Sequence, residues 1–341
     1  MRPSTKLALL FSTASCLASQ PCAAQDPVAE FYRGRQVTVL VGSSAGGSAS
    51  LYAQALARHM GRYLPGGASL VVQHMPGAGG LVVANTIANT AARDGTAFAI
   101  TSRTTAIEPL LGNRNAKFDG RQFHWLGTAN VEYTTCFAWH TAAVKTLADT
   151  LSKELIVAGT GADATEVVWP KAANKLIGTK FKIVLGYPGS TEMLLAMERG
   201  EVEGNCGLGW TFLKLRKADW LKEKKINLLF QWSLAKHPDL PGVPLIIDSA
   251  KTAEDRKVFE FLLATQEMGR PFFAPPGVPA ERVKALRDAF ALTLKDGQFL
   301  ADADKMGIEV QHVGGEAIQA LVARIYAAPP EVIARAKAAA E

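Results

Sequence analysis

A predicted strand, a glycine-rich turn and a predicted helix follow one another twice between residues 36 and 90. The first strand is rich in valine and ends at Gly42, which is typical of a buried strand in a parallel sheet. The pattern predicts strands at 36–41, 69–73 and 97–101 and helices at 51–64 and 81–90. Strands that alternate with helices form parallel sheets with right-handed crossovers, so the sequence predicts an α/β protein.

The same pattern returns in the middle of the chain, where strands at 155–158 and 181–185 each precede a glycine-containing turn, and a helix follows at 191–199. Strand-like apolar segments flank this block, and a length of 341 residues fits two domains. We therefore predict two lobes joined by a hinge of crossover strands, with a cleft at the carboxyl ends of the strands. The first lobe is predicted at 25–130 plus 267–341, with helices at 280–294, 298–306 and 315–327; the second lobe is predicted at 131–266, and the crossovers at 131–140 and 266–274.

Composition excludes several classes of protein. Hydrophobic residues make up 48% of the chain and charged residues 20%, as in ordinary globular proteins rather than disordered or fibrous ones. A net charge of +6, spread along the chain, does not favour nucleic-acid binding and is compatible with an anionic small-molecule ligand.

The first residues predict an export signal. Arg2 and Lys6 precede a short apolar run at 7–17, and Cys22-Ala23-Ala24 resembles a signal-peptidase site. We expect residues 1–24 to be a signal peptide cleaved near Ala24. The alternative is a lipoprotein in which Cys16 carries the lipid.

Only Cys136 and Cys206 remain after removal of the signal peptide. In an exported protein two cysteines favour one disulfide, and the alternative is a pair of buried free thiols. Neither cysteine lies in a C-x-x-C pair and the histidines are scattered, so no metal is predicted. No cofactor is predicted either, because the Gly77-x-Gly79 and Gly159-x-Gly161 pairs lack the third glycine of a dinucleotide fingerprint.

Several motifs together resemble one family. They are Val-Gly-Ser-Ser-Ala-Gly-Gly at 41–47, Pro-Gly-Ala-Gly-Gly at 76–80, Gly186-Tyr187-Pro188-Gly189, His237-Pro238-Asp239-Leu240-Pro241 and Gly269-Arg270-Pro271. In their order and spacing the chain resembles the substrate receptors of tripartite tricarboxylate transporters, also called Bug receptors. The resemblance implies a two-lobed periplasmic-binding-protein fold of type II character. It also implies a monomeric receptor that closes on a small organic carboxylate and delivers it to a membrane permease.

The glycine turns of the first lobe are candidate carboxylate sites. A glycine-rich turn that enters a helix exposes backbone N–H groups at the positive end of the helix dipole. The alternative is that these glycines only permit a tight strand-to-helix turn. The candidates are Ser43, Ser44, Ala45, Gly46, Gly47 and Ser48 in one turn and Ala78, Gly79 and Gly80 in the next.

The second lobe offers hydroxyls and aromatic rings to the same cleft. Its candidates are Thr160, Gly161, Ala162, Tyr187, Gly189, Ser190 and Trp210. The aromatic rings could instead pack in the core. Arg103, at the end of the third predicted strand, is the cation placed nearest the cleft, where it could pair with a carboxylate. Alternatively, Arg103 has no role in binding and is either exposed to solvent or paired with Glu108.

Two positions depart from the family resemblance. Ser50 stands where the family usually has an Asp, and His74-Met75 stands where many members have Arg. The loss of a charge near the predicted site leaves the identity of the ligand open. Dicarboxylates, tricarboxylates, aromatic acids and amino acids all suit a cleft of this type.

Two alternatives come from other classes of protein. Gly42-x-Ser44-x-Gly46 matches the nucleophile elbow of an exported serine esterase with Ser44 as nucleophile, but it lies on the first strand, with too little chain before it for that fold. The lysine-rich segments at 214–217 and 222–225 could dock a permease or a sensor, although a solvated helix also explains them.

The predicted export signal can be tested by mass spectrometry of the protein recovered from the periplasm of a Gram-negative host. We expect a new N-terminus near Gln25, because signal peptidase cleaves after small residues such as Ala24. A full-length product in the cytoplasm would contradict export. A lipid on Cys16 would support the lipoprotein alternative.

Overall fold

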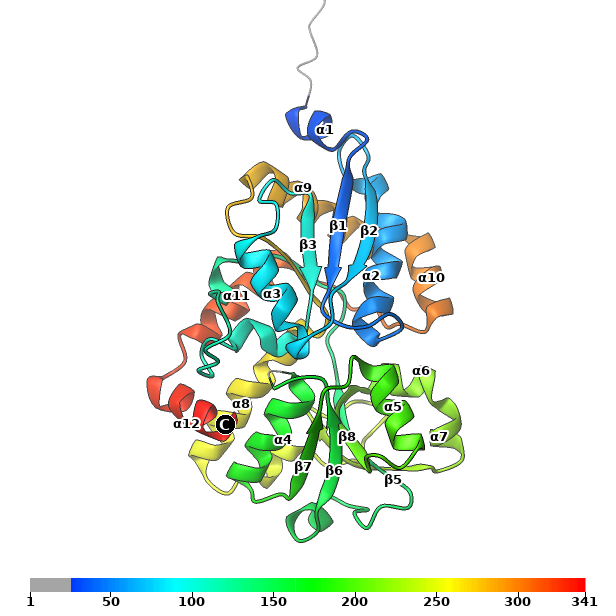
Figure 1. Ribbon diagram of the computed structural model, residues 1–341, viewed down its shortest axis with the longest axis vertical. Helices are drawn as coiled ribbons and strands as arrows, with labels where there is room; N and C mark the ends of the chain where they lie inside the picture. The colour runs from blue at the N-terminus through cyan, green and yellow to red at the C-terminus, as the bar shows by residue number, and fades with distance from the viewer. Residues whose placement is uncertain (1–25, 163, 341) are drawn as a thin grey trace, which may run out of the picture.

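The computed structural model describes residues 26–162 and 164–340, which form two lobes, each built around its own sheet (Figure 1). The predicted signal peptide at 1–24, with Cys16, lies outside these residues. Within the described ranges, none of the helices has the length and apolar character needed to cross a membrane.

The first lobe contains a six-stranded sheet with the order β11-β4-β10-β3-β1-β2. Strands β1, β2 and β3 pair in parallel, and β10 runs antiparallel to β3 and β4. Its strands are β1 (Gln36–Val41), β2 (Ser69–His74), β3 (Ala97–Ile100), β4 (His124–Thr128), β10 (Pro271–Ala274) and β11 (Val313–Gly314). Its helices are α1 (Pro27–Tyr32), α2 (Ser48–His59), α3 (Leu81–Asn89), α9 (Ala280–Thr293), α10 (Gly297–Met306) and α11 (Gly315–Tyr326).

The second lobe contains a five-stranded sheet with the order β7-β6-β8-β5-β9. Strand β6 pairs in parallel with β7 and β8, whereas β5 runs antiparallel to β8 and β9. Its strands are β5 (Thr134–Trp139), β6 (Leu155–Gly159), β7 (Phe181–Leu185), β8 (Gly204–Gly209) and β9 (Ile226–Trp232). Its helices are α4 (Thr165–Leu176), α5 (Ser190–Glu198), α6 (Trp210–Arg216), α7 (Ala218–Lys222) and α8 (Ala253–Leu263).

Strand β8 is an element that the sequence pattern did not predict, because its three glycines suggest a loop. Each of these glycines is in close contact with a neighbouring segment: a Cβ on Gly204 would meet Phe137 O at 2.5 Å, and one on Gly207 would overlap with Glu166. The strand is therefore glycine-rich because two other elements pack directly on its backbone.

The chain passes from the first sheet to the second between β4 and β5, returns between β9 and β10, and reaches the second lobe again near its C-terminus. Helix α12 (Pro330–Ala340) buries Val332, Ala336 and Ala339 and packs against α4 and α8 of the second lobe (Figure 1). The assignment of all of 267–341 to the first lobe is therefore wrong for α12. Pro329 and Pro330 lie just after the end of α11, where the chain changes direction.

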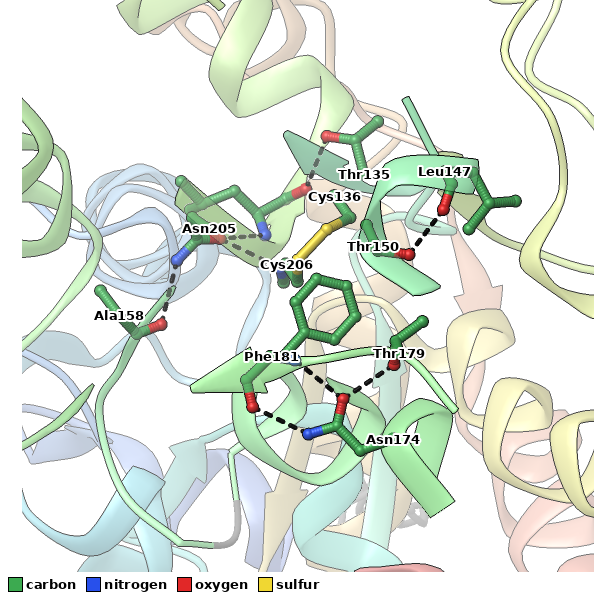
Figure 2. The surroundings of a disulfide bond; sticks show 12 residues. Thr135, Cys136, Leu147, Thr150, Ala158, Asn174, Thr179, Phe181, Asn205 and Cys206 are labelled. Atoms are coloured by element: carbon green, nitrogen blue, oxygen red, sulfur yellow. Dashed lines mark hydrogen bonds between the residues drawn. A yellow bond between two sulfur atoms is a disulfide. The ribbon is translucent and has the colours of Figure 1, made fainter. Parts of the chain in front are cut away.

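Cys136 on β5 and Cys206 on β8 are joined in a disulfide, and both are fully buried (Figure 2). The ladder between these strands shifts register between Thr135 and Phe137, so Cys136 lies at an irregularity opposite Cys206. The bond therefore ties two neighbouring strands of the second sheet and closes a segment with a sequence separation of 70 residues.

We predict that the mature protein, unfolded without reductant, contains no titratable thiol. Reduction should destabilise it by up to about 4 kcal/mol, because the cross-link restricts the unfolded chain. Thiol counting under denaturing conditions, followed by thermal melts with and without reductant, measures both effects. Two free thiols in the unreduced sample would contradict the disulfide.

Candidate ligand-binding site

A cavity of about 90 Å³ lies between the lobes, at the carboxyl ends of β1, β3 and β6. In Figure 1, β1, β2 and β3 point toward the second lobe. One water needs about 10–15 Å³ measured in this way, so the cavity has room for a small organic molecule. Its walls are formed by Gly42, Ser43, Ser48, Ala49, Gly79, Thr101, Ser102, Arg103, Thr160, Ala164, Thr165, Glu166, Gly189, Ser190, Met193, Gly207, Leu208, Gly209 and Arg270.

Three helices begin at this cavity. The first residues of α2, α4 and α5 are Ser48, Thr165 and Ser190, and all three line the wall. None of these helices has a side-chain cap at its N-terminus. Backbone N–H groups in the first turn of a helix lack partners within the helix and lie at the positive end of its dipole. Three such helix starts around one cavity create a region that favours an anion.

Seven of the residues that the sequence singled out line the cavity: Ser43, Ser48, Gly79, Arg103, Thr160, Gly189 and Ser190. Ten others are not part of its wall: Ser44, Ala45, Gly46, Gly47, Ala78, Gly80, Gly161, Ala162, Tyr187 and Trp210.

Ser44 lies at a contact between the lobes instead. Its backbone N–H donates to Pro188 O at 3.3 Å, and its hydroxyl donates to the Glu192 carboxylate at 3.1 Å. Gly189 lies against the same residue, since a Cβ there would meet the Ser44 hydroxyl oxygen at 2.5 Å. This turn therefore helps to hold the lobes together.

A second contact joins the turn of Ala78 and Gly79 to the turn of the second lobe that contains Gly161. A Cβ on Gly161 would overlap with the backbone of Ala78 and Gly79, and one on Gly79 would lie 2.9 Å from Ala164 N. Gly79 also has a φ of +66°, which favours glycine. The glycines at this contact thus allow the two lobes to meet backbone to backbone.

Gly47 and Trp210 have structural roles rather than the predicted contact with the cavity. The Gly47 N–H is used within its own turn, where it donates to Ser44 O at 3.4 Å. Trp210 is 6% exposed and belongs to a hydrophobic core, and its Nε1 donates to Asp239 at 3.1 Å. Tyr187 also packs against that core, as the alternative for the aromatic rings anticipated.

Arg103 lies in a buried cluster of charges on the cavity wall. It donates to Thr134 Oγ1 at 2.7 Å, and its Nη2 lies 3.9 Å from Glu132 Oε2. Burial lowers the pKa of the Arg103 guanidinium to about 10, while Glu132 raises it and Arg270 lowers it. The side chain therefore stays charged at neutral pH.

Glu132 and Arg270 complete this cluster, and the sequence analysis did not predict a site role for either residue. Arg270 Nη2 lies 2.6 Å from Glu132 Oε2, and the two residues are 8% and 2% exposed. Both belong to the crossings between the lobes. A charged residue inside a crossover segment was the signal in the sequence, but only the fold brings the two crossings together.

The two departures from the family resemblance lie side by side, away from the cavity wall. Ser50 is fully buried, and its hydroxyl lies 2.8 Å from His74 Nε2. Gln54 Nε2 also donates to the Ser50 hydroxyl at 2.9 Å. The absence of Asp and Arg at these positions therefore leaves the charge on the cavity wall unchanged. It changes instead the side-chain contact between α2 and β2.

The environment of Ser44 does not resemble that of an esterase nucleophile. Its hydroxyl donates to a carboxylate, and among the described residues no histidine forms a hydrogen bond with it.

The described part of the chain also lacks any group of three or more His, Cys, Asp or Glu side chains able to hold a metal ion.

The lysine-rich segments form ion pairs near the surface. Lys214 lies 2.7 Å from Asp239, Lys217 lies 2.6 Å from Glu198, and Lys225 lies 2.7 Å from Glu223. These pairs agree with the simpler explanation, a solvated helical surface.

No family model and no curated protein matches the chain. Several solved structures do match the chain. The periplasmic binding protein BugD has a TM-score of 0.70 at 22% identity and covers 90% of this chain and 97% of its own. MatC from Rhodopseudomonas palustris with bound malate has a TM-score of 0.68 at 20% identity, covering 90% of this chain and 99% of its own. An R. palustris protein with adipate has a TM-score of 0.67 at 20% identity, covering 89% and 97%.

These likenesses confirm the fold prediction. The chain has the two-lobed fold of Bug- and TctC-type periplasmic binding proteins. BugD is named a periplasmic binding protein, and the other two neighbours were solved with a small carboxylate.

The buried charge cluster can be tested with Glu132→Gln. We expect a loss of about 3–5 kcal/mol in the free energy of unfolding, because Arg103 and Arg270 would remain buried without a negative partner. Asp288→Asn, which breaks an exposed pair with Lys284, is the control and should change stability by less than about 1 kcal/mol. Urea unfolding measures both. Equal stability of the two variants would show that the cluster does not support the hinge.

Proposed function

We propose that the protein is an exported solute-binding protein of the periplasm. In this proposal the monomeric protein captures a small organic carboxylate in the cavity between its lobes. It then delivers the solute to the membrane permease of a tripartite tricarboxylate-type transporter, and it catalyses no reaction. The observation that carries the proposal is the convergence of the uncapped N-termini of α2, α4 and α5 on one cavity.

Binding of the carboxylate follows from those helix starts. Its oxygens accept hydrogen bonds from first-turn N–H groups, which have no partners within their helices. The hydroxyls of Ser48 and Ser190 lie on the same wall, and the buried Ser43 hydroxyl has no hydrogen-bond partner among the described residues. A solute that supplies oxygens at these positions satisfies donors that are otherwise left unpaired.

Closure of the lobes follows from the glycine contacts. The solute contacts both lobes, because α2 belongs to the first and α4 and α5 to the second. Binding therefore favours the arrangement in which Gly79 and Gly161 meet and Ser44 bonds to Glu192. This closed form is the one that the permease would recognise.

The function can be tested by thermal melts of the mature protein with malate, adipate, succinate, citrate and amino acids. A solute that binds only the folded protein raises the melting temperature. At a hundredfold excess over Kd it adds about 2.7 kcal/mol to the free energy of unfolding. Absence of any shift across all small carboxylates would contradict the proposal. Hydrolysis of an ester that is lost in Ser44→Ala would favour the esterase alternative instead.

The role of the backbone amides can be tested with Ser48→Pro. Proline is well tolerated as the first residue of a helix, and Gly47 before it already has an extended backbone, but the substitution removes one N–H at the cavity. We expect the affinity for the best solute to fall by about 1–3 kcal/mol, measured by calorimetry.

Ser48→Ala is the matched control, because it removes the same hydroxyl and keeps the N–H. It should have the smaller effect on affinity. If Ser48→Pro folds and binds the solute as tightly as Ser48→Ala, the amides of α2 do not hold the carboxylate.

A further inference from the structure

We infer that the solute carries an ammonium group beside its carboxylate, so that it is an amino acid, and that Glu166 selects it. This inference rests on the proposed function and narrows it to one class of solute. Glu166 is the second residue of α4, lines the cavity and is 9% exposed. It was not among the residues that the sequence singled out.

The Glu166 side chain is held in place on one side only. Its Oε1 accepts hydrogen bonds from the Thr160 hydroxyl at 2.6 Å and from the Thr160 N–H at 3.1 Å. Gly207 packs against its Cβ with no room for a side chain of its own. The second oxygen, Oε2, accepts no hydrogen bond from the residues that the structure describes. This oxygen is therefore free to accept a hydrogen bond from a molecule that fills the cavity.

The two arginines on the cavity wall do not supply that donor. Arg270 is paired with Glu132 at 2.6 Å, and Arg103 donates to Thr134 and lies 3.9 Å from Glu132. Glu166 is near enough to raise the pKa of Arg103, but none of the described Lys, Arg or His nitrogens lies within 4.0 Å of its carboxylate oxygens. Glu132 is therefore in direct contact with an arginine, and Glu166 is not.

The remaining unpaired groups on the wall are donors. The buried Ser43 hydroxyl has no partner among the described residues, nor does Nε of Arg270, a side chain that is 8% exposed. Together with the helix N-termini these donors suit a carboxylate. A second carboxylate next to Glu166 would bring two like charges together, which is unfavourable. An ammonium group there pairs with Glu166, so an amino acid matches both parts of the wall.

The test compares solutes that differ only in the ammonium group. Calorimetry with the mature protein at neutral pH would measure L-aspartate against succinate, L-glutamate against glutarate and L-norvaline against pentanoate. We expect the amino acid of at least one pair to bind, and to bind on the order of tenfold or more tightly than its partner, because a charge-assisted hydrogen bond is added. L-Malate, which offers a hydroxyl in place of the ammonium of aspartate, should also bind more weakly than aspartate.

Glu166→Gln should reduce or abolish the preference for the amino acid, since the amide keeps the size of the side chain and can still accept from Thr160. Glu260→Gln removes the same charge from an exposed position on α8 and should leave the preference unchanged. Equal or tighter binding of succinate, glutarate, pentanoate or malate by the unaltered protein would overturn the inference while supporting the proposed function. A preference that survives in Glu166→Gln would overturn the role of Glu166. Absence of binding by every solute tested would count against both proposals.

Discussion

The structure depends on the close approach of two backbone turns from different lobes. The turn with Ala78 and Gly79 lies against the turn with Gly161 and Ala164, and a Cβ on either glycine would meet the backbone opposite. Because no side chain separates the turns, the helices that start behind them end up around one small cavity. Gly79 and Gly161, which the sequence analysis named as candidate ligand contacts, thus act mainly by allowing the lobes to meet.

The electrostatics of the cavity follow from this arrangement. Helix N-termini from both lobes contribute partial positive charge, and Glu132 at the hinge is matched by Arg103 and Arg270. The hinge carboxylate is buried and paired, so the groups left for a solute are the helix amides, the Ser43 hydroxyl, Nε of Arg270 and the Glu166 carboxylate. The proposed function and the proposed selection for an amino acid both rest on this division between paired and unpaired groups.

The sequence predicted the elements whose signals are local. The strands β1, β2, β3, β6 and β7 and the helices α2, α3 and α5 carry β-branched runs, glycine turns or helical periodicity, and the structure places them within a few residues of expectation. Strand β8 was missed because its glycines suggest a turn, whereas they are needed for close contacts with Phe137 and Glu166. Helix α12 was misplaced because the lobe on which a terminal helix packs is a tertiary property. The pairing of Ser50 with His74 and the cluster around Glu132 likewise depend on segments far apart in the chain.

The most direct test of the account is a crystal structure of the mature protein with its tightest-binding solute. The account predicts a solute enclosed between the lobes, with its carboxylate oxygens within hydrogen-bond distance of first-turn N–H groups of α2, α4 or α5. A solute bound outside this cavity, or one whose carboxylate contacts none of these N–H groups, would contradict it.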